Sequence, residues 1–362
     1  MKIVKDIARF AVGGLFIFSG LIKVNDPVGT AIKLEEYFQV FAYDFAPLFS
    51  WFIPAALFFS VLLSVLEVII GIALIMGYRM KVTAWTLMVI IVFFTFLTFY
   101  SAYFNKVTDC GCFGDAIKLS PWESFIKDIV LLLLSGVVFI NRSSYSPLLP
   151  ALKGDIVVGS STLVFVIISI YAIRNLPFVD FRTYAVGNDL PALMQPSGEL
   201  KYAYIMLKDG EEYRLETYPT DNSYQFKSME ILNPEVQPKI TDLSIWNDEG
   251  EFTDNLLSGK KLLFIVSDAQ KARGKNADKL KQLSNQLNNV EVWSLTSSDE
   301  DYYKVWANNV GISIPFYYAD ATVLKTIVRS NPGIVLLDNG LVKGKWHVNN
   351  TPSSSEISRL LR

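Results

Sequence analysis

Long apolar runs separated by short charged patches dominate the first half of the chain. The clearest run, residues 82–105, contains no charged residue. A second run covers residues 51–77 and is interrupted only by Glu67, and a third run covers residues 156–173. A membrane-spanning helix needs about 20 predominantly apolar residues. These three runs therefore predict three transmembrane helices.

Two shorter apolar runs, 10–22 and 129–141, complete this pattern. Basic residues flank both: Lys5 and Arg9 at the first, Lys127 and Arg142 at the second. Their stems can lie along apolar surface while their charged heads reach the interface, so we predict five spanning helices. A soluble bundle would need amphipathic stripes, which residues 87–100 do not have. The first run lacks a clear small-residue cleavage site, so we expect an uncleaved helix rather than a signal peptide.

Basic residues in short loops predict the orientation of these helices. The amino terminus and the loops 78–81 and 141–155 carry basic residues, whereas residues 23–50 carry more acids than bases. We therefore expect the amino terminus to lie in the cytoplasm, with the helices in the cytoplasmic (inner) membrane. Five crossings then place the residues after Arg174 on the extracytoplasmic side.

The second half of the chain reads as an α/β domain. A hairpin is predicted over residues 203–215, with its turn at Asp209-Gly210. Predicted strands and helices then alternate: strands at 261–266 and 290–295, helices at 276–287 and 299–308, and a final hairpin that turns at Asn339-Gly340. Alternating strands and helices imply a partly parallel sheet with an antiparallel edge.

Residues 240–362 resemble the thioredoxin fold in its membrane-anchored TlpA-like form. The resemblance rests on the turns at 248–250 and 258–260 and on Asn331-Pro332 before the last hairpin. It implies that Pro332 is in the cis form and faces the family's active site. Where the family carries its Cys-x-x-Cys, this chain has no cysteine in residues 267–273. We therefore expect a redox-silent domain that serves in binding or positioning.

Composition narrows the class of protein. Hydrophobic residues make up 51% of the chain, and 33 basic against 35 acidic residues leave a net charge of -2. Such a balance argues against a nucleic-acid binder. Two cysteines are too few for disulfide bonds to stabilise a fold of this size. One histidine with two cysteines does not supply the ligands of a conventional zinc site. We therefore predict no metal site.

Both cysteines lie in the outer loop that joins the third and fourth predicted helices. Cys110 and Cys112 can close only a very small ring, and Gly111 between them permits the backbone angles that such a ring demands. A strained bridge is more easily reduced, which favours exchange. Three interpretations stay open: a redox-active pair, a static bridge or simple packing, and a metal site shared with another chain. The supporting loop residues are Asp109, Gly111, Phe113, Gly114 and Asp115.

Residues 1–145 resemble DoxX/MauE membrane proteins, in the long form seen in Bacteroidota. The resemblance rests on the strings 18–23 and 25–27, on Glu67 and Gly71, and above all on residues 110–115. It implies a four-helix bundle and a link to disulfide maturation in the periplasm or to thiol redox chemistry with quinone. The predicted domains are this bundle (1–145), a loop with a fifth transmembrane helix (146–177), a β-rich connecting segment (178–239) and the thioredoxin-like domain (240–362).

Glu67 lies near the middle of a predicted membrane helix. A charged side chain there costs about 2.5 to 3.5 kcal/mol by insertion scales, so we expect Glu67 to be protonated or paired with Lys23 or Lys127. A structural hydrogen bond and a proton relay explain it equally well. Asp128 is a second intramembrane polar candidate, and Lys127 and Asp128 could also act as interfacial anchors.

We predict a polytopic α-helical membrane protein with a thiol/disulfide redox role in the maturation of envelope proteins. In this hypothesis Cys110 and Cys112 cycle between dithiol and disulfide, and quinone or a separate thioredoxin-like protein takes the electrons. Membrane lipid and a periplasmic client are the expected partners. The alternative is a non-enzymatic scaffold or assembly factor of an envelope membrane complex, in which the silent domain is a docking module.

Overall fold

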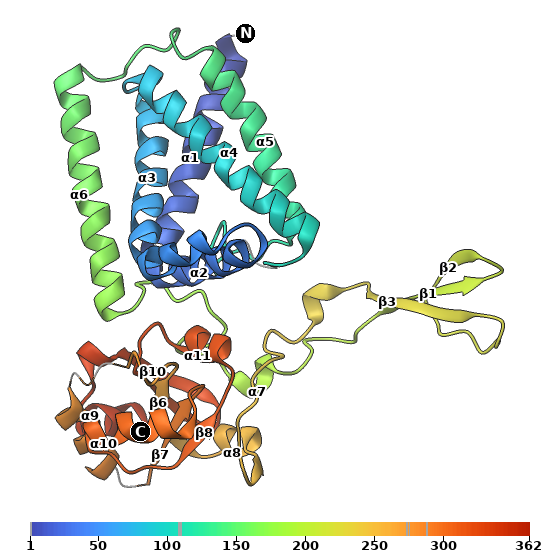
Figure 1. Ribbon diagram of the computed structural model, residues 1–362, viewed down its shortest axis with the longest axis vertical. Helices are drawn as coiled ribbons and strands as arrows, with labels where there is room; N and C mark the ends of the chain where they lie inside the picture. Colours follow the sequence, from blue (N-terminus) through green and yellow to red (C-terminus); the bar gives the residue numbers. More distant parts are fainter. Residues whose placement is uncertain (1, 108–110, 273, 275, 287–288) are drawn as a thin grey trace. The chain divides into compact units, whose positions relative to one another are not determined.

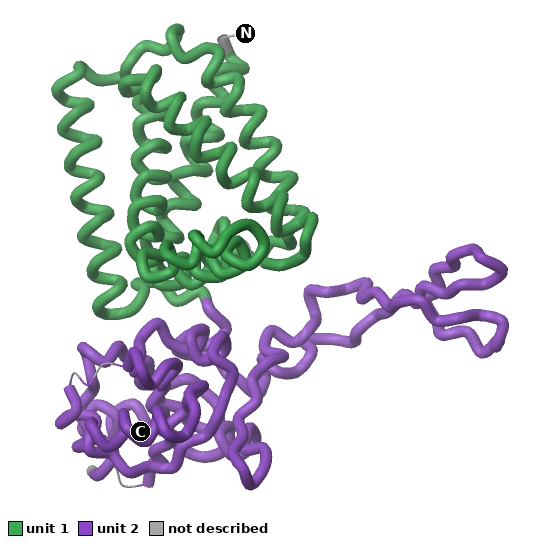
Figure 2. The backbone as a smooth tube through the Cα atoms, viewed as in Figure 1, with its two compact units in different colours: residues 1–181 green, residues 182–362 purple. Residues whose placement is uncertain are grey.

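The structure is a computed structural model that describes residues 2–107, 111–272, 274, 276–286 and 289–362. The chain divides into two compact units, residues 1–181 and residues 182–362 (Figure 2). The first unit is helical and the second combines sheets with helices, as the sequence predicts.

In the first unit, long helices run up and down beside one another and a shorter helix crosses one end (Figure 1). Each predicted apolar run lies within one of the long helices or leads into it. The crossing helix is α2 (Pro27–Asp44), followed by the 3-10 helix η1 (Pro47–Ala55). The long helices are α1 (Lys2–Asn25), α3 (Ala56–Met76), α4 (Met80–Phe104), α5 (Pro121–Ile140) and α6 (Ala151–Asn175).

By length and composition, four helical segments of the described chain could cross a membrane, rather than the five predicted. The segment that falls short is α5, because Glu123, Lys127 and Asp128 lie in its first half. The helix begins at Pro121, ahead of the charge-free run 129–141. The Ser120 side chain accepts from the Glu123 amide and completes a capping box there. The four segments are Ile3–Asn25, Pro47–Met76, Met80–Phe104 and Ala151–Asn175.

Helix α2 is the main element of this unit that the hydrophobic pattern does not reveal. Its four charged residues, Lys33, Glu35, Glu36 and Asp44, made residues 23–50 look like an open loop. The Asp26 side chain caps the helix by accepting from the Gly29 amide at 2.9 Å, and Pro27 follows at the first helical position. Both residues are common at the start of a helix. The start of α2 could therefore have been predicted from its capping residues, although not from the hydrophobic pattern.

Helices α1 and α3 approach one another closely because glycines face the contact. A Cβ atom added at Gly71 would lie 2.6 Å from the Gly13 carbonyl oxygen and 2.9 Å from the Ile17 nitrogen. One added at Gly20 would lie 2.8 Å from the Val68 nitrogen. Any side chain at these positions would force the two backbones apart. This close contact sets the register in which the polar side chains of α1 meet those of α3.

The up-and-down course brings distant loops to a common end. At one end, Lys5 donates to Ser144 and the Leu148 amide donates to the Met76 carbonyl oxygen at 2.9 Å. At the other end, the Asn25 side chain exchanges two hydrogen bonds with the backbone of Val179, after α6. The loops predicted to share one side of the membrane therefore do lie together within this unit.

The second unit is built on a mixed sheet of strand order β10-β9-β6-β7-β8-β4-β5. Its central strand, β6 (Lys260–Val266), pairs in parallel with β7 and antiparallel with β9. Residues 261–266 are buried without a break, as expected of a central strand covered on both faces. The other strands are β4 (Trp246–Asn247), β5 (Gly250–Glu251), β7 (Glu291–Thr296), β8 (Phe316–Tyr318), β9 (Gly333–Asp338) and β10 (Leu341–His347).

The connections of this sheet define a thioredoxin-like domain, which confirms the prediction. β6, α9 and β7 form a parallel βαβ unit, and β9, β10 and α12 form an antiparallel ββα unit on the other side of β6. The Asn331-Pro332 peptide bond before β9 is cis. The helices of this unit are α7 (Leu190–Leu193), α8 (Thr253–Leu257), α9 (Ala277–Gln286), α10 (Glu300–Val310), α11 (Ala321–Ile327) and α12 (Ser354–Leu360), with 3-10 turns η2 (Pro234–Val236) and η3 (Val348–Asn350).

A separate three-stranded sheet of order β2-β1-β3 precedes this domain in the chain. Its strands are β1 (Tyr202–Lys208), β2 (Glu211–Leu215) and β3 (Gln225–Ile231). Lys208 pairs with Glu211 across the Asp209-Gly210 turn, which confirms the predicted hairpin. The connecting segment, predicted to be irregular and rich in β-structure, thus contains a regular antiparallel sheet.

The close contact of α1 with α3 predicts opposite outcomes for two glycines of this unit. Gly71→Ala places a methyl group against the α1 backbone, and we expect it to destabilise the helical unit by about 1–3 kcal/mol, the usual cost of overpacking. At Gly14, on α1, no atom lies within 4 Å of an added Cβ, so Gly14→Ala should leave stability equal or slightly higher. Thermal unfolding in detergent micelles measures both, and an equal loss in the two variants would contradict the close contact.

Candidate functional site

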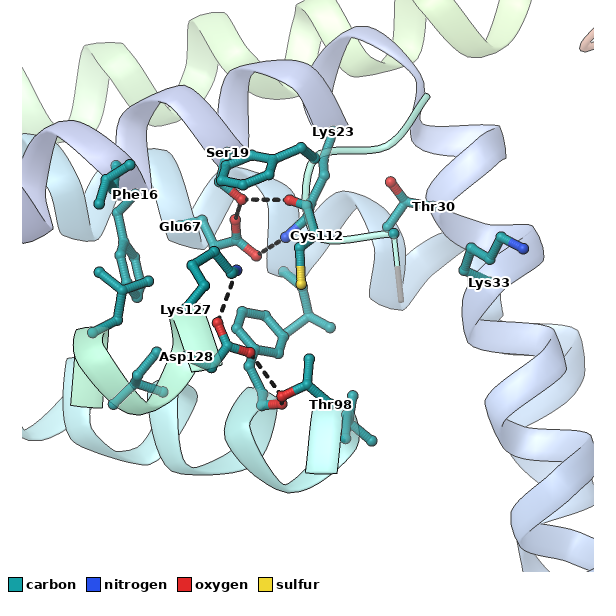
Figure 3. A pocket seen from close by; sticks show the side chains of 18 of the residues that line it. Phe16, Ser19, Lys23, Thr30, Lys33, Glu67, Thr98, Cys112, Lys127 and Asp128 are labelled. Carbon is teal, nitrogen blue, oxygen red and sulfur yellow. Dashed lines mark hydrogen bonds and ion pairs between the residues drawn. The ribbon is translucent and has the colours of Figure 1, made fainter. Parts of the chain in front are cut away.

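A cavity lies where α1 to α5 meet the turn that contains Cys112 (Figure 3). Its volume is about 70 Å³. One buried water needs roughly 10–15 Å³, so there is room for several. Most of the lining is apolar, and Phe16 and Phe94 are part of it. The polar lining residues are Ser19 and Lys23 of α1, Thr30, Lys33 and Tyr37 of α2, Glu67 of α3, Thr98 of α4, Cys112, and Lys127 and Asp128 of α5.

Glu67 is paired with Lys23 inside the bundle. The Lys23 Nζ atom lies 2.5 Å from Glu67 Oε1, and the two residues are 8% and 2% exposed. The structure thus selects Lys23 from the two partners that the sequence left open. A buried pair of this kind offsets the cost of placing each charge in a medium of low dielectric constant.

Ser19 connects this ion pair to the cysteine turn. Its hydroxyl oxygen lies 3.0 Å from Glu67 Oε2 and 2.8 Å from the main-chain oxygen of Cys112 (Figure 3). Ser19 is four residues before Lys23, so both side chains leave the same face of α1. The backbone of the turn is therefore tied to the buried carboxyl group of Glu67.

A second ion pair flanks the cysteine from α5. Lys127 Nζ lies 2.8 Å from Asp128 Oδ1, while Asp128 Oδ2 accepts from the Thr98 hydroxyl at 3.0 Å. The Lys127 ammonium group also hydrogen-bonds with the Cys112 side chain and lies 5.0 Å from the ring centroid of Phe113. Asp128 is 2% exposed and faces the interior of the bundle.

Gly111 adopts the backbone conformation that the sequence predicts for it. Its φ angle is +66°, in the left-handed region that favours glycine, and an added Cβ would lie 3.2 Å from Lys33 Cγ. Phe113, two residues later, is buried and its ring centroid lies 5.7 Å from that of Phe18. These contacts hold the turn against α1 and α2, with Cys112 directed into the cavity (Figure 3).

Helix α2 closes the cavity and is fixed at its far end by Asp44. This carboxyl group accepts from Lys106 and from the Tyr100 hydroxyl of α4. The pKa of Asp44 lies below its ordinary value. The hydrogen bond from Lys106 lowers it most, and the hydrogen bond from Tyr100 has the next largest effect. Nearer the middle of α2, Tyr37 and Ser101 share a hydrogen bond of 2.7 Å.

The structure brings most of the predicted site residues together. Cys112, Gly111, Phe113, Glu67, Lys23 and Asp128 all line the one cavity. Gly114 and Asp115 lie in the same turn but are not among the lining residues. Cys110 and Asp109 fall outside the described residues, so the pairing of the two cysteines remains a prediction.

Pro332 belongs to the second unit and has its own surroundings. The Asn331 side chain donates to the Asp268 main-chain oxygen at 2.6 Å, which joins the proline loop to the segment after β6. In the thioredoxin fold this segment carries the cysteine pair, but here it reads Ser267-Asp268-Ala269-Gln270. This place therefore offers no thiol for disulfide exchange.

Ser19 and Thr98 are site residues that the sequence reading missed as such. Each is a polar residue within a membrane-length apolar run, which is itself a signal for an interior position. Ser19 has the further signal of its spacing from Lys23. Among the described residues, no group of three or more His, Cys, Asp or Glu side chains could hold a metal ion.

Comparison with known proteins relates the first part of the chain to a family. Residues 1–141 match the family model of methylamine utilisation protein MauE. Protein TlpB of Flavobacterium psychrophilum is 27% identical over 136 residues, which are 36% of this chain and 35% of that protein. The match thus spans about a third of the length of this curated relative. A solved thioredoxin-like protein from Bacteroides caccae ATCC 43185 is 14% identical with a TM-score of 0.22, over 90% of this chain and 87% of that chain.

The resemblance inferred from the sequence is therefore confirmed. Residues 1–141 are similar to the MauE family, and the second unit has the strand order of a thioredoxin-like fold. The first assignment rests on the family match and the apolar helices, and the second on the sheet order and connections described above.

The buried Lys23–Glu67 pair predicts a large effect from removing one partner. Lys23→Met leaves the Glu67 charge buried without its partner and should cost about 3–5 kcal/mol of stability, while Lys23→Met/Glu67→Gln should regain most of it. A matched control is Lys33→Met, because Lys33 and Glu36 form a partly exposed pair at 3.1 Å and should contribute under about 1 kcal/mol. Thermal unfolding of the full chain in detergent micelles compares them. Equal losses for Lys23→Met and Lys33→Met would contradict the pairing.

Proposed function

We propose that this protein is an inner-membrane thiol/disulfide redox protein that uses Cys110 and Cys112 to support the oxidation or maturation of envelope proteins. The observation that carries this proposal is the placement of the Cys112 side chain against the Lys127 ammonium group, in a cavity between two buried ion pairs. A neighbouring cation favours the thiolate, which is the reactive form of cysteine. A cysteine that only filled space would not need such surroundings.

The proposed reaction has two balanced halves. In the first, Cys110 and Cys112 lose two electrons and two protons as their sulfur–sulfur bond forms, and an acceptor of the quinone class or a separate thioredoxin-like protein takes the electrons. In the second, a client thiolate attacks that disulfide and forms a mixed disulfide. The second client thiol then resolves it, so that the client gains a disulfide and the pair returns to the dithiol.

A quinone fits the chemistry of the cavity lining. The wall is mainly apolar and includes three phenylalanine rings, while the ammonium groups of Lys23 and Lys127 and the hydroxyl of Ser19 are hydrogen-bond donors. These donors suit the carbonyl oxygens of a planar quinone ring. A quinone held by these residues would supply a two-electron acceptor beside Cys112.

The thioredoxin-like domain would position a client or partner rather than exchange electrons. Both cysteines of the chain lie in the helical unit, so this domain has no thiol of its own. The lack of a thiol is also the feature that favours the second candidate function, a scaffold or assembly factor of an envelope membrane complex with structural cysteines. Thiol trapping separates the two.

Thiol trapping in intact cells tests the redox proposal. We expect Cys110 and Cys112 to be found in both oxidised and reduced forms, with a shift when the supply of client protein or quinone changes. Acid quenching followed by alkylation and mass spectrometry measures the two populations. If the pair never changes oxidation state and the double serine variant keeps full function, the scaffold interpretation replaces the redox one.

The contact with Lys127 predicts the reactivity of the Cys112 thiol. In a Cys110→Ser background, Lys127→Met should slow alkylation of Cys112 at neutral pH roughly ten- to hundredfold, because a close cation stabilises the thiolate by about that factor. Lys127→Arg keeps the charge and should restore most of the rate. Lys118→Met, an exposed lysine of the same loop, is the matched control and should change nothing. A rate that does not respond to Lys127→Met would refute the role of this lysine.

The proposed orientation places the amino terminus in the cytoplasm and the thioredoxin-like domain in the periplasm. It requires α5 to cross the membrane despite its three charged residues. A phosphatase that is active only in the periplasm, fused after Arg362, should be active, and the same enzyme fused after Tyr145 should be inactive. Activity in the opposite pattern, or in neither fusion, would contradict this orientation.

A further inference from the structure

We propose that Glu67 is the base that accepts the proton of the Cys112 thiol, and that Ser19 couples this transfer to the cysteine turn. This inference rests on the proposed redox function and names the proton acceptor of that same site. It follows from the balance of charges in the cavity and from the number of protons that one serine hydroxyl can donate.

The charged groups of the cavity are balanced pair by pair. Lys23 is paired with Glu67 and Lys127 with Asp128, while Lys33 at the α2 side is paired with Glu36. A thiolate at Cys112 would add one unpaired negative charge to a buried, largely apolar site, which is costly. If the thiol proton moves to Glu67, the negative charge only changes position and the total stays the same.

The hydrogen bonds around Ser19 favour the same transfer. Ser19 has one hydroxyl proton but lies within hydrogen-bond distance of two acceptors, Glu67 Oε2 at 3.0 Å and the Cys112 main-chain oxygen at 2.8 Å. When Glu67 is a carboxylate, the Ser19 hydroxyl can donate a hydrogen bond to only one of these two oxygens at a time. When Glu67 carries a proton, it can donate to Ser19, and Ser19 can donate to Cys112. Protonation of Glu67 therefore completes the chain that holds the cysteine turn.

The cavity also offers a route for the proton. Cys112 and Glu67 line the same space, whose volume of about 70 Å³ has room for several waters. The acid–base step is balanced within the site, because the Cys112 S–H bond breaks and a Glu67 O–H bond forms with no change in oxidation state. Lys127 then faces the thiolate, and Lys23 remains hydrogen-bonded to the neutral carboxyl group.

The pH dependence of Cys112 alkylation tests this inference in the full chain with Cys110→Ser. An internal transfer makes the thiolate fraction independent of bulk pH, so we expect a nearly constant rate between about pH 6 and pH 8 after correction for the reagent. Lys23→Met/Glu67→Gln removes the base together with its partner and keeps the charges balanced. In that variant the rate should rise about tenfold per pH unit, as for a thiol that ionises to solvent. Among the described residues, the titratable groups that line the cavity besides Cys112 are Lys23, Lys33, Tyr37, Glu67, Lys127 and Asp128. The α4 residues that line it are not titratable: Ile91, Phe94, Leu97 and Thr98.

Substitutions of two serines distinguish a loss of the coupling between Glu67 and Cys112 from a general loss of structure. Ser19→Ala removes the hydroxyl that connects Glu67 to the Cys112 main chain. It should move the pH profile of Cys112 alkylation toward that of Lys23→Met/Glu67→Gln. Ser64→Ala, which removes a buried serine that bonds only within α3, should leave the profile flat. If the double variant keeps the flat profile of its parent, Glu67 is not the base. If instead the parent itself reacts as slowly and as steeply with pH as an ordinary thiol, Cys112 is not activated and the proposed function fails with it.

Discussion

The need to keep a carboxylate inside a membrane helix shapes the helical unit. Glu67 lies in the middle of α3, with apolar residues on either side, and its charge is tolerated because Lys23 reaches it from α1. That pairing requires the two helices to approach closely, which Gly20 and Gly71 permit. The remaining parts of the site are arranged around this pair. Ser19, one turn from Lys23, extends it to the backbone of the cysteine turn.

A second constraint comes from the thiol itself. A reactive cysteine at the edge of a membrane needs a cation nearby and a place for its proton, and both have to be sheltered from bulk water. Lys127 of α5 and Glu67 of α3 meet these needs, while α2 contributes to the cavity wall and is fixed by Asp44 at its far end. Within one chain, the thiols belong to the membrane region and the thioredoxin-like domain has none. We interpret this as a division between electron transfer and client positioning.

The sequence predicted the features that depend on composition and on local chemistry. Apolar runs located the long helices, the Asp209-Gly210 turn located a hairpin, and the residues around Gly111 located the turn with its left-handed glycine. Features that depend on contacts between distant segments were not predictable in the same way. Lys23 and Lys127 were equally good partners for Glu67, because the choice depends on how α1 and α3 pack rather than on spacing along the chain.

Two further differences have simple physical causes. Charges on α2 hid a helix whose cap at Asp26 and proline at position 27 were visible in the sequence. The capping box at Ser120 likewise begins α5 ahead of its apolar part, which brings Lys127 and Asp128 into a regular helix that faces the interior. Charged residues mark helix ends in many membrane proteins, and here they mark a site within the bundle instead.

The central claim is that Cys110 and Cys112 form an exchangeable pair activated by the buried charges. The most direct test is a titration of the purified full-length protein in lipid nanodiscs against glutathione redox buffers, with the disulfide quantified by mass spectrometry. The account predicts a two-electron transition within the range of these buffers, at a potential above about −300 mV, the region of labile rather than structural disulfides. A pair that stays oxidised throughout the range, or that forms no disulfide at all, would contradict it.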